Sequence, residues 1–424
     1  MANTPSHAAV AEQQAGTLLV SQHIVPVHRR PTISSLFLLI ISALLTSCKE
    51  RLPDYPPSYR EYAYVTNGKS NSVSVLDTRN FRPLTTIPVG LNPTGVAINP
   101  KKNEVYVVNT GSSSLSVIDA EQNNVVKTIS LGKNPYFVDV APDGTRAYVA
   151  NSGSNTVSII DLGNRRVLRT IAVGNAPGMA RVSPDGKVVV VAERLGNSIS
   201  VIDTARMAVR SSISVCKEPT DVQILPDSSK AFIACSASAQ VAAVALTVPS
   251  SAKSSAPYRL LALLDVGTTP VQLALKPDGG EIFVSNYGSD TISEIATNTN
   301  EVGGSYVIGA GPVRGLVTAD NTILYVSNFK SDTVGIYSID DGKALGWIQV
   351  GNRPDALALS PNQNFLFVVD TGAGDVMVIR TSVSQRSNVP RERWFPTLTI
   401  IPVGQQPNAI AIKAFLSSRQ TALP

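Results

Sequence analysis

Short apolar runs rich in β-branched residues recur along the chain, and turn residues separate them. Between residues 104 and 142 the runs are "VYVVN" (105–109), "LSVID" (115–119), "VVKTISL" (125–131) and "YFVDVAP" (136–142). Alternation of this kind, bounded by Gly, Asn, Asp and Pro, predicts β-strands. No window in 61–415 sustains the i, i+3, i+4 spacing of an amphipathic helix. The pattern therefore predicts an all-β protein.

The same group of four runs repeats along most of the chain. The segment 104–132 returns 42 residues later as 146–174, and eight such units can be aligned. They begin at Glu61, Glu104, Arg146, Lys187, Lys230, Glu281, Ile323 and Phe365. Four short strands in each unit of this length predict one blade of a β-propeller.

The repeat resembles a known family. The stretches "AYVTN" (63–67), "SVSVLDT" (72–78) and "TTIPVGLNPTGVAINP" (85–100) are similar to the YVTN-type β-propeller repeat, and the likeness recurs in register eight times. The resemblance implies blades with strands in the order A ("PTGVAI"), B ("AYVTN"), C ("SVSVLD") and D ("TTIPVG"), with A innermost. It implies much less about function, because propellers carry many activities.

The two ends of the repeat region predict how the ring closes. The chain enters at strand B (62–67) and leaves at an A-type strand, "PNAIAI" (407–412). Pairing these ends completes an eighth blade and leaves no open sheet edge. We therefore expect eight four-stranded antiparallel blades in a monomeric ring. Seven blades, with one degenerate unit outside the ring, is the alternative.

The N-terminal segment has the features of an export signal. Residues 28–30 ("HRR") precede an apolar run at 36–45, which is too short to span a bilayer of about 30 Å as a helix. The following "LTSC" (45–48) resembles a bacterial lipobox, in which Cys48 is acylated; an ordinary signal peptide or an uncleaved anchor is the alternative. The organisation expected is a signal peptide at 1–47, a tether at 48–60, a propeller at 61–415 and a tail at 416–424.

Composition narrows the choice of partners. After removal of 1–47 the chain keeps 34 basic and 30 acidic residues, a net charge of +4 without a dense Lys/Arg run. Nucleic acid is therefore not an expected partner, because binding phosphates needs a clustered basic surface. We expect an exported protein, lipid-anchored in the bacterial cell envelope and facing the periplasm. The lipoprotein sorting rule would favour the outer membrane, since Lys49 follows the cysteine.

The absence of histidine excludes several kinds of chemistry. His7, His23 and His28 all lie in the leader, so the exported chain has no His-based triad, metal site or haem ligation. Asp77, Asp119, Asp161 and Asp203 end strand C in four units and are read as turn caps rather than as a ring of metal ligands. We expect no metal, no cofactor and no catalysis. The prediction is a binding propeller, with a lactonase-like or haem d1-like protein as the alternative.

One face of the ring is the candidate binding surface. Because antiparallel strands alternate in direction, the D–A and B–C loops share the face on which the central channel opens. The candidate ligand residues assigned to these loops are Tyr136, Phe137, Arg194, Asp221, Tyr287, Arg314, Phe329, Lys330, Arg353 and Asp355. Aromatic and Arg side chains of this kind are enriched at binding hot spots. On the opposite face, an insertion at 382–396 with Arg391, Arg393 and Trp394 is a candidate loop for an envelope protein or surface ligand.

Two cysteines replace two repeated residues. Seven units have Gly after strand D, and the remaining unit has Cys216; most units end strand B with Asn, and the next unit has Cys235. Both positions lie on the same face and strands A and B pair, so we expect a disulfide, which an oxidising compartment preserves. Two independent replacements that stay reduced are the alternative.

Overall fold

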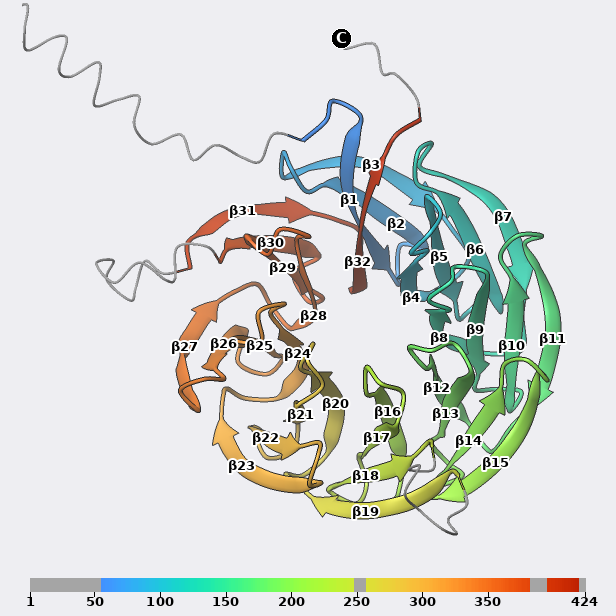
Figure 1. The fold of residues 1–424 in the computed structure, drawn as a ribbon. Helices are drawn as coiled ribbons and strands as arrows, with labels where there is room; N and C mark the ends of the chain where they lie inside the picture. The colour runs from blue at the N-terminus through green and yellow to red at the C-terminus, as the bar shows by residue number, and fades with distance from the viewer. Residues whose placement is uncertain (1–54, 248–256, 382–394, 419–424) are drawn as a thin grey trace, which may run out of the picture. The chain divides into compact units, whose positions relative to one another are not determined.

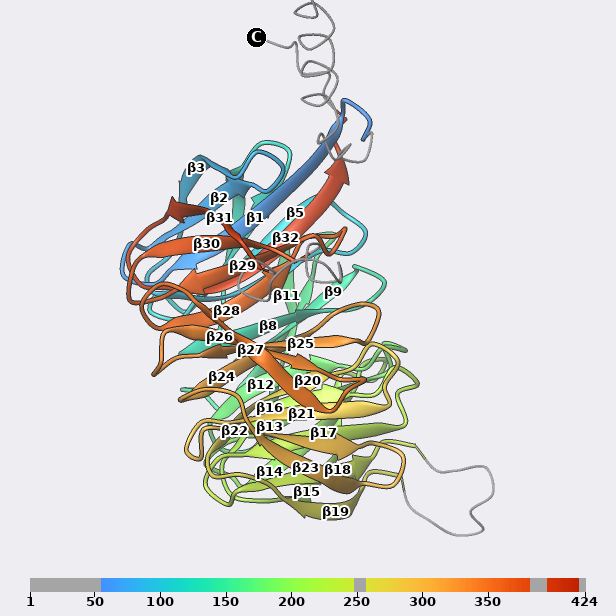
Figure 2. The same cartoon turned by 90° about the vertical axis from the view of Figure 1, so that its left-hand side faces the viewer.

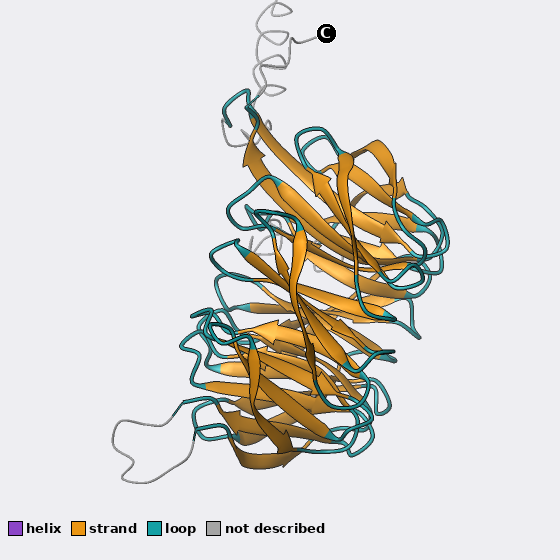
Figure 3. Cartoon of the chain, turned by 90° about the vertical axis from the view of Figure 1, so that its right-hand side faces the viewer, coloured by secondary structure: helices purple, strands orange, loops and turns teal. Residues whose placement is uncertain are grey.

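The protein is described by a computed structural model in which residues 55–247, 257–381 and 395–418 are placed. Within these ranges the chain forms 32 β-strands in eight antiparallel four-stranded sheets and no helix (Figures 1 and 3). All of these strands belong to one compact unit, which begins at Pro57. The predicted eight-bladed propeller is therefore confirmed, and the seven-bladed alternative is wrong.

Each blade runs from an innermost strand A beside the channel to an outermost strand D (Figure 1). The innermost strands are β4 (Pro93–Ile98), β8 (Pro135–Val140), β12 (Pro177–Val182), β16 (Pro219–Ile224), β20 (Pro270–Leu275), β24 (Pro312–Val317), β28 (Pro354–Leu359) and β32 (Pro407–Leu416). The B strands are β1 (Tyr59–Asn67), β5 (Glu104–Asn109), β9 (Arg146–Asn151), β13 (Val188–Glu193), β17 (Lys230–Cys235), β21 (Glu281–Asn286), β25 (Ile323–Asn328) and β29 (Phe365–Asp370).

The outer half of each blade consists of strands C and D. The C strands are β2 (Ser72–Asp77), β6 (Ser114–Asp119), β10 (Thr156–Asp161), β14 (Ser198–Asp203), β18 (Gln240–Ala245), β22 (Thr291–Ala296), β26 (Thr333–Ser338) and β30 (Asp375–Arg380). The D strands are β3 (Arg82–Pro88), β7 (Asn124–Ser130), β11 (Arg166–Ala172), β15 (Ala208–Ser214), β19 (Arg259–Asp265), β23 (Glu301–Val307), β27 (Lys343–Gln349) and β31 (Thr397–Pro402).

Both ends of the propeller contribute to its closing blade, in the order β3-β2-β1-β32. Strand β32 runs antiparallel to β1, with Tyr59 opposite Leu416 and Ala63 opposite Ile412 (Figure 2). Because this pairing covers the inner edge of β1, no blade is left incomplete. Strand β1 starts at Tyr59, within the segment assigned to the tether.

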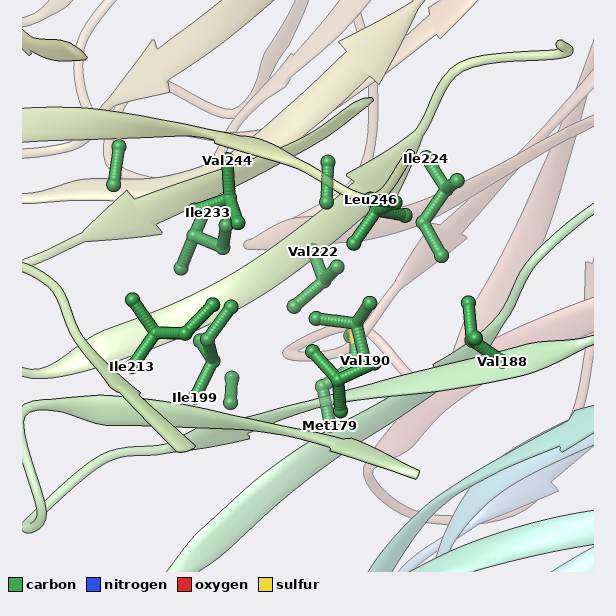
Figure 4. Packing of buried hydrophobic residues seen from close by; sticks show 14 of the residues in the cluster. Met179, Val188, Val190, Ile199, Ile213, Val222, Ile224, Ile233, Val244 and Leu246 are labelled. Carbon is green, nitrogen blue, oxygen red and sulfur yellow. The ribbon is translucent and has the colours of Figure 1, made fainter. Parts of the chain in front are cut away.

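The hydrophobic core is distributed between the blades. Among the described residues, eight clusters of buried apolar side chains form, and each joins two neighbouring blades. In one of them Val190 and Ile199 of one blade pack with Val222 and Ile233 of the next (Figure 4). Strands B and C are buried on both faces, which explains their near-continuous apolar runs.

Two kinds of polar contact recur around the ring, one at the end of strand C and one at the end of strand B. The Asp at the end of strand C caps the following turn: Asp77 Oδ1, for example, accepts the backbone N–H groups of Arg79 and Asn80 at 3.0 and 3.2 Å. The Asn at the end of strand B is buried, and Asn67 Nδ2 donates to the hydroxyls of Ser72 and Ser74. A Cβ on Gly404, in the connector above Asn67, would lie 2.7 Å from the Asn67 Cβ, so the connector needs Gly there.

Candidate functional site: the mouth of the central channel

The innermost strands bring the candidate residues to one pocket. A cavity of about 660 Å³ opens at the channel, and it is lined by strands β8, β12, β16, β20, β24 and β28 with the neighbouring B–C turns. Seven of the ten predicted ligand residues line it, namely Tyr136, Arg194, Asp221, Tyr287, Arg314, Phe329 and Asp355. The volume is within the range of about 300–1,000 Å³ that small-ligand sites occupy.

Five of the candidate residues lie on strands rather than in loops. Tyr136 and Phe137 belong to β8, Asp221 to β16, Arg314 to β24 and Asp355 to β28. The sequence interpretation was wrong here because each innermost strand begins at its Pro, directly after the connector. These side chains are therefore carried by paired backbone, which holds a site more rigidly than a loop does.

Charged side chains of alternating sign follow the channel wall. Arg181 lies between two carboxylates: its Nη1 is 3.9 Å from Asp139 Oδ1, and its Nη2 is 4.0 Å from Asp221 Oδ1. Farther round the ring, Arg314 Nε is 3.3 Å from Asp355 Oδ1. The described residues provide no hydrogen-bond acceptor for the terminal nitrogens of Arg314, and its side chain is 42% exposed. Arg314 can therefore donate to a ligand while Asp355 holds it in place.

The carboxylates of Asp139 and Asp221 also have a structural role, because they accept hydrogen bonds from the next blade. An innermost strand has a free edge, and its N–H groups need acceptors. Asp221 Oδ2 accepts the N–H of Leu273 in the next blade at 2.8 Å, and Asp139 Oδ2 accepts that of Val182 at 3.0 Å. Gln272 Oε1 accepts the N–H of Gly315 in the same way at 2.7 Å. These contacts tie the blades together around the channel.

Burial and neighbouring charge oppose each other in this network. Burial raises the pKa of Asp221 and of Asp139 above the usual range, and the Arg181 guanidinium counteracts the rise in both. Burial alone would lower the pKa of Arg314, but Asp355, Tyr136 and Asp221 keep it above its ordinary value. Arg314 is therefore a permanent positive charge at the pocket.

Aromatic rings form the rim of the pocket. Tyr136 is 51% exposed. Lys330 Nζ lies 4.1 Å from the ring centroid of Tyr287, and the Arg353 guanidinium carbon lies 5.9 Å from that of Phe329. Lys330 and Arg353 are thus engaged with rim aromatics instead of lining the cavity, and the contacts are of the cation–π type.

The structure also separates one candidate from the site and adds others. Phe137 packs against the core cluster between two blades, and its ring lies under Arg181, 4.9 Å from the guanidinium carbon. Asp139, Met179, Arg181 and Gln272 were missed. A signal for them was present, because the innermost strands β32 of the closing blade and β4 of the blade after it carry Gly or Ala at the equivalent positions.

The predicted disulfide is confirmed. Cys216 and Cys235 are bonded, with their Cα atoms 5.7 Å apart. The bond joins the connector before β16 to the end of β17, which are the positions of the repeated Gly and Asn. It lies in the core cluster between two blades and closes a short loop.

Other predicted sites fall on residues outside the described ranges. Cys48 and the insertion residues Arg391, Arg393 and Trp394 belong to this group. Within 55–247, 257–381 and 395–418 no group of three or more His, Cys, Asp or Glu residues is arranged to hold a metal ion. The same ranges contain no helix of the length and apolarity needed to cross a bilayer.

Comparisons with known proteins agree with the fold. The model of the YNCE-like β-propeller family matches residues 141–339, and that of the lactonase family of seven-bladed β-propellers matches residues 57–169. Curated proteins yielded no significant match. The chain is a β-propeller, as the YVTN-type resemblance implies, although its ring has one blade more than the lactonase description states.

Solved structures share the architecture at low sequence identity. Dihydro-heme d1 dehydrogenase NirN in complex with DHE is similar with a TM-score of 0.68 and 14% identity, covering 87% of this chain and 78% of that one. Hydrazine synthase from Kuenenia stuttgartiensis is similar with a TM-score of 0.54 and 22% sequence identity, and the match covers 65% of this chain and 91% of that one. A candidate 6-phosphogluconolactonase from Bacteroides fragilis is similar with a TM-score of 0.58 and 16% sequence identity, and the match covers 85% of this chain and 100% of that one. Identities this low establish the fold alone.

Proposed function

We propose that this β-propeller is an exported, lipid-anchored protein of the bacterial cell envelope that binds a ligand at the mouth of its central channel and performs no chemistry itself. The observation that carries the proposal is the gathering of seven predicted residues in one 660 Å³ pocket. The binding partner is a small molecule, or a segment of an envelope protein, that presents a hydrogen-bond acceptor and a flat apolar part.

The groups around the pocket suit such a ligand. Arg314 offers its terminal nitrogens to a carboxylate or carbonyl group, and the bidentate geometry of guanidinium favours planar acceptors. Tyr136 and Phe329 provide aromatic surface for the apolar part. Asp139 and Asp221 are already hydrogen-bonded to backbone N–H groups. Because each oxygen of both carboxylates accepts a backbone N–H, this engagement supports a structural and binding role over a catalytic one.

An enzyme or cofactor-handling protein is the alternative, and the fold neighbours are its support. The residues at the pocket do not fit haem ligation well, because no histidine follows residue 28 and Met179 is 8% exposed and contacts Arg181. We derive no haem or lactone chemistry from the site. A visible absorption band in the purified protein would favour this alternative.

Photo-crosslinking in cells tests the binding site. A photo-reactive amino acid placed at Tyr136 should form an adduct with the ligand or partner, detected as a mass increase or a band shift. The matched control is the same residue at Lys187, whose side chain is 80% exposed on the A–B face. Equal labelling at both positions, or labelling at Lys187 alone, would contradict a site at the channel mouth.

A further inference from the structure

Two carboxyl groups face each other in the blade next to the closing blade. Asp370 ends β29 and Asp375 begins β30, and the two residues are direct partners in the antiparallel ladder. Five other blades have Asn in the first position and Ser or Thr in the second. There the amide donates to the hydroxyl, as Asn67 Nδ2 does to Ser72 Oγ at 3.2 Å. Two ionised carboxylates cannot form such a bond, because neither has a proton to donate.

The site around Asp370 is buried, and the donor nearest its carboxyl group is the backbone N–H of Gly351, which partly counteracts the rise in the pKa of Asp370 without making a well-formed hydrogen bond. Asp370 is 0% exposed, and neither of its carboxyl oxygens has a well-formed hydrogen bond within the described residues. Glu193 holds the same position in another blade and shows the contrast. It accepts hydrogen bonds from Ser198, from Ser200 and from the N–H of Gly174. In the Asp370 blade the two serines are replaced by Asp375 and Met377.

The neighbouring charges do not compensate for two adjacent negative charges, one buried at Asp370 and one half-buried at Asp375. Asp332, from the preceding blade, adds a third carboxylate, which accepts the backbone N–H of Arg353 at 2.8 Å. The guanidinium of Arg353 itself lies over Phe329, and no Lys or Arg in the described ranges forms an ion pair with Asp370 or Asp375. Burial raises the pKa of Asp370 to about 8, and the charge of Asp375 adds to the rise.

We propose that Asp370 and Asp375 share one proton in the folded protein at neutral pH, so that one carboxyl donates to the other and replaces the Asn–Ser/Thr bond of the other blades. Loss of this proton leaves two adjacent negative charges, one of them on the fully buried Asp370. The connector before β28 rests directly on this pair, because a Cβ on Gly351 would lie 2.6 Å from Asp370 Oδ2. The pair is thus an alkaline-sensitive contact between this connector and its blade.

The direction of the pH effect follows from proton binding. The pKa of Asp370 is raised from 3.8 in the unfolded chain to about 8 in the folded protein. Between these values the folded state holds one proton more than the unfolded state, so the free energy of unfolding falls as the pH rises. The loss continues as the pH rises through the folded pKa of about 8 and levels off above it, and it is absent below the unfolded pKa.

Thermal unfolding at several pH values tests the proposal. Asp370→Asn restores the residue of the other blades and removes the shared proton. We compare the difference in melting temperature, variant minus wild type, at the two ends of the range. We expect this difference to be at least about 2 °C larger at pH 9 than at pH 5. Asp375→Ser, which restores the hydroxyl, should give the same trend and serves if the first variant does not fold.

Two results would overturn the proposal. One is a constant difference in melting temperature between wild type and both variants across this pH range. The other is a rise in the wild-type melting temperature on adding Ca²⁺ at pH 8 that both variants lack, because the pair would then hold a cation. Glu193→Gln is the matched control, since Glu193 already has three donors, and its difference from wild type should not grow with pH.

Discussion

At the scale of single residues, each blade depends on a contact between the connector residue after strand D and the residue that ends the next strand B. The connector Gly and the residue at the end of strand B are in contact: a Cβ on Gly404 would lie 2.7 Å from the Asn67 Cβ, and Gly174 and Gly351 pack in the same way against Glu193 and Asp370. In one blade both positions become cysteine and are bonded. The same blade also has Ala242 where other blades have the serine that accepts from Asn. Three of the repeated residues are therefore replaced in the same part of the ring.

This coupling predicts the outcome of restoring the repeat. Cys216→Gly combined with Cys235→Asn should lower the free energy of unfolding by on the order of 3 kcal/mol at most, because the cross-link is lost. Adding Ala242→Ser gives Asn at 235 a hydroxyl acceptor and should recover about 1 kcal/mol. Denaturant unfolding without reductant measures both steps.

The wild-type background provides the control for this series. There Ala242→Ser should not stabilise, since Cys235 makes no hydrogen bond to that position in the structure. Titration of unreduced, denatured wild-type protein should find no free thiol at Cys216 or Cys235. Two free thiols from these residues would contradict the disulfide.

At the scale of elements, the last strand has the largest effect on the fold. Strand β32 covers the inner edge of β1 and contributes side chains such as Ile410 and Ile412 to the core on one side of the closing blade. Lys413 donates to the carbonyl of Asn99 at 2.6 Å and so links the same strand to the first complete blade. One strand therefore joins both neighbours of the seam.

Truncation tests the role of the closing strand. Deleting residues 405–424 removes β32 and exposes the edge of β1, which is an aggregation hazard. We expect insoluble protein, or a fall in melting temperature far larger than a local defect would cause. Deleting residues 419–424 alone is the control and should leave solubility unchanged. A 405–424 deletion that melts like the full-length chain would mean that β32 does not close the ring.

At the scale of the whole molecule, the ring is regular while its channel wall is not. Charged residues line the wall on β8, β12, β16, β24 and β28, whereas β4 and β32 present mainly small side chains. The side chains that differ between blades are therefore concentrated on one part of the channel wall. The proposed lipid anchor would hold this ring at a membrane surface.

Lipidation is tested by one substitution in the leader. Cys48→Ser should move the protein from the membrane fraction to the soluble periplasmic fraction, because stable anchoring needs acyl chains that contribute about 0.8 kcal/mol per buried CH₂. Ser47→Ala keeps a small residue before the cysteine and should stay with the membrane. A Cys48→Ser protein that still sediments with membranes would show that another feature anchors it.

The amino-acid pattern was sufficient to predict the class of fold, the number of blades and the way the ring closes. Each of these rests on local signals that recur eight times, so one ambiguous strand cannot change the result. The disulfide could also be predicted from the sequence, because equivalent positions of a regular repeat occupy equivalent places in each blade. The turn-capping role of Asp77 and its equivalents followed from the same local chemistry.

The contacts between polar side chains of different blades could not be predicted from the sequence and follow from the packing of the blades. Asp139, Arg181 and Asp221 come from three blades, and their contacts across the channel depend on the spacing between innermost strands. The burial of Asp370 depends in the same way on the connector packed above it. Strand periodicity identifies which face a side chain occupies. It does not give the distance between blades, and that distance sets both the charge network and the pKa of a buried carboxyl.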